Sequence, residues 1–132
     1  MTRYMLDTNT VSYLIKEDPC VAQRVMAVPM ASLCISAITQ AEMVFGLARR
    51  PDAKRLHVAV REFLRRVDVL PWNSLIAECY GVLRSDLERQ GNMLASLDLL
   101  IAAHALGVGA ALVTNDMAFR QVPNLLVENW TG

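Results

Sequence analysis

The amino-acid sequence predicts an α/β domain in which helices flank a short, mostly parallel central sheet. Short apolar runs, each typical of a buried strand, alternate along the chain with longer segments of helical periodicity. No low-complexity segment, internal repeat or linker interrupts the 132 residues. We therefore expect a single domain over residues 1–132.

The first half of the chain is expected to form two strands and three helices. Tyr4–Leu6 is the first apolar run, and the Asp7-Thr8-Asn9-Thr10 segment after it is typical of a helix start. A second helix begins at Pro19, because proline is favoured in the first turn of a helix. Leu33–Ser36 is the second predicted strand, and a helix that carries Glu42 follows it.

The second half is expected to alternate in the same way. An amphipathic helix with its cations facing outward is predicted by apolar residues at Leu56, Val60, Phe63, Leu64 and Val67. A long helix with one apolar face from Leu75 to Leu87 should end near Gly91. The other predicted elements are strands at Val67–Leu70, Ala111–Thr114 and Leu125–Glu128 and a largely buried helix at Leu97–Leu106.

Positive charge gathers in one segment, although the chain as a whole is balanced, with 13 Lys and Arg against 13 Asp and Glu. Between Arg49 and Arg66 lie seven cations against only Asp52 and Glu62. Such a run is typical of a solvated helix face, and it also suits contact with a partner protein or with an RNA backbone, whose binding then depends strongly on salt. The candidate RNA-binding residues are Arg49, Arg50, Lys54, Arg61 and Arg65.

The three cysteines indicate neither a zinc site nor a disulfide framework, because they are far apart and no C-x-x-C pair is present. The N-terminal residues reach Asp7 before an apolar signal segment forms. The most apolar region, residues 97–113, is interrupted by Asp98 and His104. We therefore expect a cytoplasmic protein with reduced thiols and no membrane span.

Four acidic residues are candidates for a site at the carboxyl edge of the sheet. Asp7 and Asp116 directly follow predicted strands, which is where α/β folds place their ligands. Each acid also has a purely structural interpretation. These are a helix cap for Asp7, a Thr39–Glu42 capping box, a first-turn acid for Asp98 and a turn residue for Asp116.

The surroundings of Asp98 favour a functional interpretation. Its helix is apolar and contains no lysine or arginine, so an ionised carboxylate there needs another partner. Several acids without a cation repel one another and raise their pKa values, and a divalent ion relieves this repulsion. Carboxylate ligands favour a hard ion, so we expect Mg²⁺ or Mn²⁺. With only His57 and His104 present, a metal-free ribonuclease is poorly supported.

Five short segments form an ordered pattern along the chain. They are Met5-Leu6-Asp7-Thr8-Asn9-Thr10, Ala41-Glu42, Asp98-Leu99-Leu100-Ile101-Ala102-Ala103-His104-Ala105, Leu112-Val113-Thr114-Asn115-Asp116 and the closing residues 122–130. In order and spacing they strongly resemble the VapC toxins, the PIN-domain ribonucleases of bacterial type II toxin–antitoxin pairs. One departure is Ala95, where members of that family often have a glycine.

The resemblance implies a PIN-like three-layer α/β fold and roles for individual residues. Asp7, Glu42 and Asp98 match the acids of the family's metal site, and Asp116 matches the fourth. The residues that match the polar groups orienting these acids and a bound water are Asn9 and Thr114.

The resemblance also implies a function and partners. The family consists of Mg²⁺- or Mn²⁺-dependent endoribonucleases that cut structured RNA, so the expected substrate is a tRNA, in particular the anticodon arm of initiator tRNA. A toxin homodimer, inhibition by a VapB-type antitoxin and a larger toxin–antitoxin assembly are implied as well. Contact with DNA is expected only through the antitoxin.

Two alternatives stay open at the level of sequence. The segment Asp7-Thr8-Asn9-Thr10-Val11 prompts comparison with small haloacid-dehalogenase-like phosphatases, although that family needs a second aspartate where this chain has Asn9. The acids can also form a non-catalytic pocket for a basic partner peptide. Such a module would bind its partner through Asp98 and show no nuclease activity with any metal.

Overall fold

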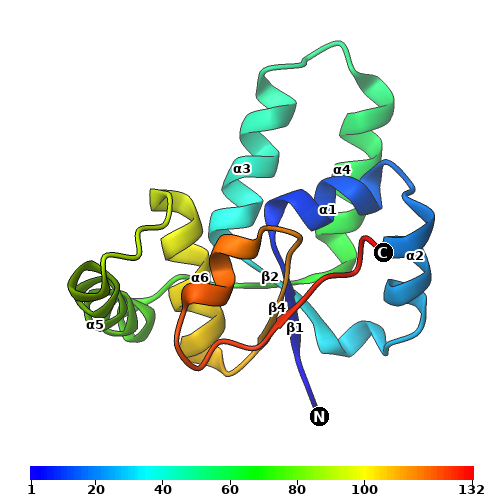
Figure 1. The fold of residues 1–132 in the computed structure, drawn as a ribbon. Helices are drawn as coiled ribbons and strands as arrows, with labels where there is room; N and C mark the ends of the chain where they lie inside the picture. Colours follow the sequence, from blue (N-terminus) through cyan, green and yellow to red (C-terminus); the bar gives the residue numbers. More distant parts are fainter.

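A five-stranded parallel sheet forms the centre of the protein, whose computed structural model describes residues 1–132 (Figure 1). Its strands are β1 (Tyr4–Leu6), β2 (Leu33–Ser36), β3 (Asp68–Leu70), β4 (Ala111–Val113) and β5 (Val127–Glu128). They lie in the order β3-β2-β1-β4-β5, and every pairing is parallel. The predicted α/β class with a short parallel sheet is confirmed.

Helices cover both faces of this sheet, which gives the predicted three layers. They are α1 (Thr8–Ile15), α2 (Pro19–Met26), α3 (Ala37–Ala48), α4 (Lys54–Arg66), α5 (Ser74–Gln90) and α6 (Ser96–Val108). In Figure 1, α3 and α4 form a helical hairpin, residues 37–66, that projects from the body and is called the arm below. None of the helices combines the length and apolar character that a membrane crossing requires.

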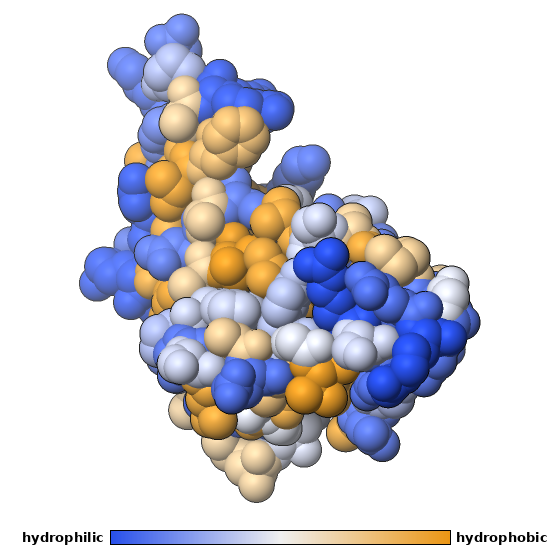
Figure 2. Space-filling model, turned by 90° about the vertical axis from the view of Figure 1, so that its left-hand side faces the viewer, coloured by the Kyte–Doolittle hydropathy of each residue, from blue (hydrophilic) through white to orange (hydrophobic).

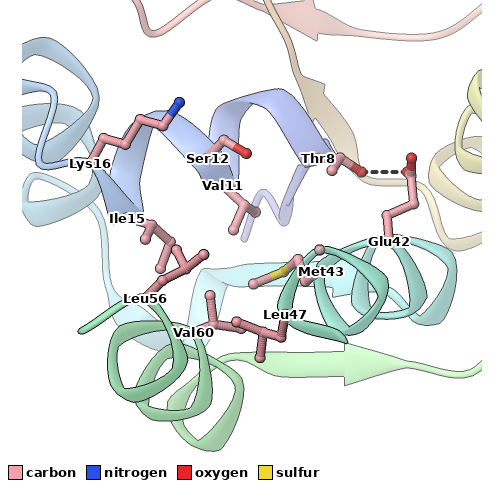
Figure 3. A pocket seen from close by; sticks show the side chains of 11 residues that line it. Thr8, Val11, Ser12, Ile15, Lys16, Glu42, Met43, Leu47, Leu56 and Val60 are labelled. Atoms are coloured by element: carbon pink, nitrogen blue, oxygen red, sulfur yellow. Dashed lines mark hydrogen bonds between the residues drawn. The ribbon is translucent and has the colours of Figure 1, made fainter. Parts of the chain in front are cut away.

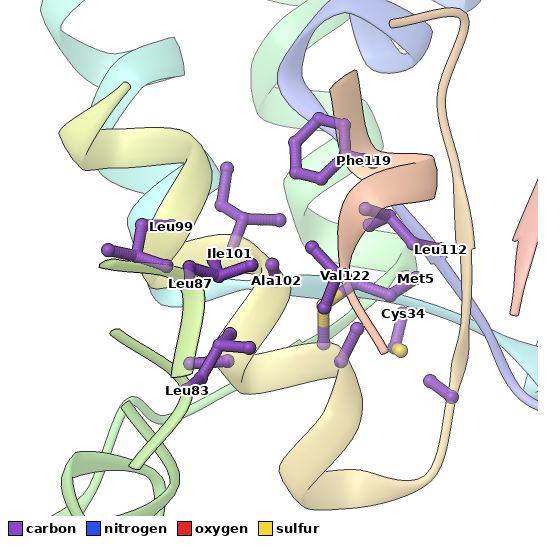
Figure 4. Packing of buried hydrophobic residues seen from close by; sticks show 13 residues of the cluster. Met5, Cys34, Leu83, Leu87, Leu99, Ile101, Ala102, Leu112, Phe119 and Val122 are labelled. Atoms are coloured by element: carbon purple, nitrogen blue, oxygen red, sulfur yellow. The ribbon is translucent and has the colours of Figure 1, made fainter. Parts of the chain in front are cut away.

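Two clusters of buried side chains pack against the two faces of the sheet. Successive residues of a strand point to opposite faces, so Met5 and Leu112 belong to one cluster while Leu6 and Val113 belong to the other. The first cluster lies between the sheet and α5, α6 and a 3₁₀ turn that buries Phe119 (Figure 4). The second lies beneath α1 to α4.

The structure departs from the sequence-based expectations at a few element ends. Leu75 was expected on the apolar face of α5 but is 65% exposed. The buried residues of this helix are Ile76, Leu83 and Leu87, and Leu75 lies about 100° around the helix from Ile76. The last strand is shorter than predicted, since Asn124 turns the chain with a φ of 67°. Two 3₁₀ turns, Met30–Ser32 and Met117–Gln121, were not predicted, because single turns show no periodicity.

Candidate active site

The carboxyl ends of β1 and β4 mark the point where the order of the strands reverses. From there the chain runs to β2 and β3 on one side and to β5 on the other, which is where open α/β sheets form their ligand crevice. Asp7 directly follows β1, and Asp116 comes shortly after β4. The Asp7 amide donates a hydrogen bond to the Val113 carbonyl at 3.1 Å, so the ends of the two strands are joined.

Asp7 is held rigidly at this point. The residue is only 4% exposed, and its Oδ1 accepts a hydrogen bond from the Thr10 amide at 2.8 Å. Thr10 in turn donates its hydroxyl to the Val113 carbonyl at 2.9 Å. Asp7 therefore caps α1, as its structural interpretation predicted, while this cap occupies only one of its two carboxylate oxygens.

Glu42 reaches the site from α3 and is oriented by a residue of α1. The Thr8 hydroxyl donates to Glu42 Oε1 at 2.6 Å, a contact that the sequence did not reveal. The capping-box interpretation of Glu42 is wrong, because α3 begins earlier and is capped by Ser36, whose hydroxyl accepts from the Ile38 amide at 3.1 Å. Glu42 thus lies in the second turn of α3, facing α1.

The pKa of Asp98 is affected by the charges of the other three acids. Asp98 lies in the first turn of α6 and is half-buried, and its carboxylate accepts no hydrogen bond from the protein. Burial raises its pKa above the ordinary aspartate value, and the nearby charges of Asp116, Asp7 and Glu42 raise it further. The charges of the other three predicted acids therefore reach Asp98.

Asp116 and its neighbours follow the end of β4. Asp116 Oδ1 accepts from the Ala118 amide at 2.9 Å, and its own amide donates to the Thr114 hydroxyl at 3.0 Å. Next to them, the Asn115 side-chain amide donates to the Tyr13 hydroxyl at 3.3 Å. Thr114 is therefore placed to orient Asp116, whereas Asn9 is exposed and forms no hydrogen bond with any of the acids.

The donor chemistry of the cluster suits a hard divalent cation. No lysine or arginine forms an ion pair with any of the four acids. No three Asp, Glu, His or Cys side chains are grouped closely enough to hold an ion in their present positions. The available ligands are carboxylate oxygens without thiolate or imidazole, which favours Mg²⁺ or Mn²⁺ over zinc. Asp7, Glu42 and Asp116 each keep one oxygen free of hydrogen bonds within the protein.

An apolar groove begins beside Glu42 and runs between α1, α3 and α4 (Figure 3). Val11 and Ile15 from α1, Met43 and Leu47 from α3, and Val60 from α4 line it, and Thr8 and Glu42 form its polar end. Glu42 therefore belongs both to the groove and to the predicted set of acids.

The five candidate RNA-binding cations all lie on the arm and are exposed. Arg65 forms an ion pair with Glu62, as does its neighbour Arg66. The other candidates form no ion pair with an acid of the protein, and they are Arg49, Arg50, Lys54 and Arg61.

Sequence relatives cover nearly the full length of the chain. The family model of the PIN domain matches residues 4–125. The chain is 34% identical over 131 residues to Ribonuclease VapC2 of Haemophilus influenzae, covering 98% of this chain and 99% of that protein. It is 32% identical over 132 residues to the tRNA(fMet)-specific endonuclease VapC of Shigella flexneri, covering 99% and 100%. The haloacid-dehalogenase alternative is therefore wrong.

Solved structures give the same result. The DNA-bound VapBC of Salmonella typhimurium superposes with a TM-score of 0.90 at 32% identity, over 98% of this chain and 99% of that chain. VapBC2 of Rickettsia felis, bound to a promoter DNA fragment, gives a TM-score of 0.89 at 33% identity with the same coverage. The sheet order, the acids at the reversal point and these relatives lead to one conclusion: the chain belongs to the PIN-domain family, within its VapC ribonuclease branch.

Proposed function

We propose that this protein is a metal-dependent endoribonuclease, the toxin of a bacterial toxin–antitoxin pair, and that Asp7, Glu42, Asp98 and Asp116 form its catalytic centre. The observation that carries the proposal is the position of Asp98, whose charge is opposed by three other acids and balanced by no cation of the protein. Relatives that share about a third of the sequence are named ribonucleases or endonucleases.

The four acids are the ligands that would hold Mg²⁺ or Mn²⁺. Such an ion, when bound, would offset their charge and that of the phosphodiester and would lower the pKa of an attacking water. The protein's own contribution is orientation. Thr8 fixes Glu42 and the Thr10 amide fixes Asp7, so each presents one oxygen in a defined direction. The carboxylate of Asp98 has no such hydrogen bond, so the protein leaves both of its oxygens available to the ion.

The proposed substrate is structured RNA, in particular the anticodon arm of initiator tRNA, which would place the enzyme in the cytoplasm. Support comes from the Shigella flexneri relative, which is named as specific for tRNA(fMet). In the proposed mechanism water attacks the phosphorus and the bond to the 3′ oxygen breaks, so the products should carry 5′-phosphate and 3′-hydroxyl ends and no 2′,3′-cyclic phosphate.

The proposed partner is a VapB-type antitoxin, which is present in the solved VapBC relatives. The groove beside Glu42 has the apolar lining that a segment of such an antitoxin would fill, and its polar end would bring the inhibitor to the acids. We further propose a toxin homodimer and a larger assembly with the antitoxin, through which alone this chain would contact DNA.

The test is cleavage of a tRNA pool by purified protein with Mg²⁺ or Mn²⁺, with EDTA as the metal-free condition. Glu42→Gln and Asp98→Asn should each lower the cleavage rate by at least about a hundredfold. Glu78→Gln is the matched control, because Glu78 is an exposed acid of α5 outside the site and without an ion pair. Its rate should equal that of the parent.

Cleavage by the Asp98→Asn protein at the parent rate would refute the assignment of the acids. If the folded parent cuts neither tRNA nor ribosomal RNA with any metal, and Asp98→Asn abolishes binding of a basic antitoxin peptide, the site is a binding pocket and not a nuclease.

A further inference from the structure

An exposed aromatic ring lies next to the acidic centre on α3. Phe45 is 60% exposed, and the guanidinium carbon of Arg49 lies 5.2 Å from the centre of its ring. Glu42, Phe45 and Arg49 are spaced i, i+3 and i+7, so they share one face of the helix. Phe45 therefore lies about one turn beyond Glu42 in the direction of the end of the arm.

The arm carries positive charge that ion pairs within the protein only partly balance. Of its seven cations, only Arg65 and Arg66 form ion pairs, both with Glu62. Figure 2 shows the projecting arm with hydrophilic side chains gathered at its end and apolar surface extending from there toward the body. The cations without an acidic partner are Arg49, Arg50, Lys54, Arg55 and Arg61.

We propose that Phe45 and these unpaired cations form a subsite for single-stranded RNA, in which an unpaired base stacks on Phe45 and the adjoining phosphates contact the cations. Aromatic rings stack on any base, and cations next to them bind the backbone. A ring at the surface selects unpaired nucleotides, because a double helix keeps its bases within its own stack. The charge around the ring favours a polyanion over an apolar peptide as the occupant.

This subsite rests on the proposed nuclease function and narrows the class of RNA that the enzyme would cut. The nucleotide stacked on Phe45 would lie one helical turn from Glu42, so the cut bond would be close to an unpaired nucleotide. Loops and bulges of a folded RNA are then the sites of cleavage, and continuous duplex is excluded.

Binding is tested in the full chain carrying Asp98→Asn, so that the RNA stays intact, by fluorescence anisotropy of a labelled single-stranded RNA oligonucleotide and of the same strand in a duplex. Adding Phe45→Ala should weaken binding of the single strand about tenfold and change duplex binding much less. Phe45→Trp should restore it, and Leu75→Ala, which removes an apolar side chain of similar exposure on α5, should change nothing. In the double variant Arg50→Ala/Lys54→Ala, the slope of log Kd against the logarithm of the salt concentration should fall by about two.

Two further outcomes separate the subsite from the nuclease. In the otherwise unaltered enzyme, Phe45→Ala should raise KM for RNA more than it lowers kcat. If cleavage depends on Glu42 and Asp98 but Phe45→Ala keeps the parent KM and affinity, the subsite is refuted and the nuclease stands. If Phe45→Ala leaves RNA binding intact and weakens only antitoxin binding, the ring serves a protein partner and the proposal is also wrong.

Discussion

A buried hydrogen bond joins the two helices that carry Glu42 and Asp98, and its removal should measurably destabilise the fold. His104 on α6 is fully buried, and its Nδ1 lies 2.7 Å from the hydroxyl of Ser36. The same hydroxyl caps α3 through the Ile38 amide. Replacing Ser36 with alanine removes both interactions and leaves His104 with no hydrogen-bond partner, because its Nε2 already has none.

The magnitude follows from these two losses. A lost helix cap destabilises a protein by about 1 kcal/mol. A buried nitrogen left without a partner adds about 1–3 kcal/mol. The free energy of unfolding should therefore fall by about 2–4 kcal/mol. With an unfolding entropy near 2.1 cal/mol/K per residue, this lowers Tm by roughly 7–14 °C for a chain of 132 residues.

Thermal denaturation followed by circular dichroism measures this change directly. Ser85→Ala is the matched control, because Ser85 is an exposed residue of α5 without a side-chain hydrogen bond, and its Tm should stay close to that of the parent. A Tm decrease of only a degree or two in Ser36→Ala would show that the buried pair contributes little, and the reasoning from burial would fail.

Three further predictions concern stability. Asp98→Asn should raise Tm while it abolishes cleavage, because it removes a charge opposed by three neighbouring acids; an unchanged or lower Tm would contradict the repulsion. Gly81→Ala should raise the free energy of unfolding by about 0.5–1 kcal/mol, since an added Cβ meets no atom within 4 Å. Gly107→Ala should give no such gain, because its Cβ would lie 2.5 Å from the side chain of the buried Ile76. Urea denaturation measures both variants against the parent. Burial lowers the pKa of His104, so on acidification the unfolded chain takes up a proton at this histidine before the folded chain does. The stability contributed by the neutral buried histidine is therefore complete above the ordinary histidine pKa of about 6.5 and is lost as the pH falls below it. Urea denaturation at neutral and at mildly acidic pH measures how much the free energy of unfolding falls on acidification. This fall should be smaller for His104→Gln than for the parent, and equal falls would assign the acid sensitivity to other groups.

Much of the fold and of the candidate site was predictable because it follows from local patterns. Apolar runs and capping residues determined the strands and helices, and the geometry of a parallel sheet predicted that Asp7 and Asp116 lie at one edge. The sequence also indicated that Asp98 lacks a cationic partner, and the raised pKa of this residue is consistent with that inference.

The contacts that orient the acids could not be predicted in the same way. Thr8 and Glu42 are 34 positions apart, and Ser36 and His104 are 68 apart. Their meeting depends on the angles at which α1, α3 and α6 pack, and no periodicity in one sequence specifies those angles. The interpretation of Thr39–Glu42 as a capping box was wrong for a related reason, since a short motif does not identify which of two hydroxyl residues begins the helix.

The double role of Asp7 has a consequence for how such a gene can decay. Asparagine caps helices about as well as aspartate, so Asp7→Asn keeps the hydrogen bond to the Thr10 amide while it removes a negative charge from the proposed centre. A change of one amino acid can thus silence the proposed enzyme and leave its shape unaltered. Because Asp7 does not line the apolar groove proposed for the antitoxin, such a variant would keep that groove and would compete with active copies of the toxin for the same inhibitor.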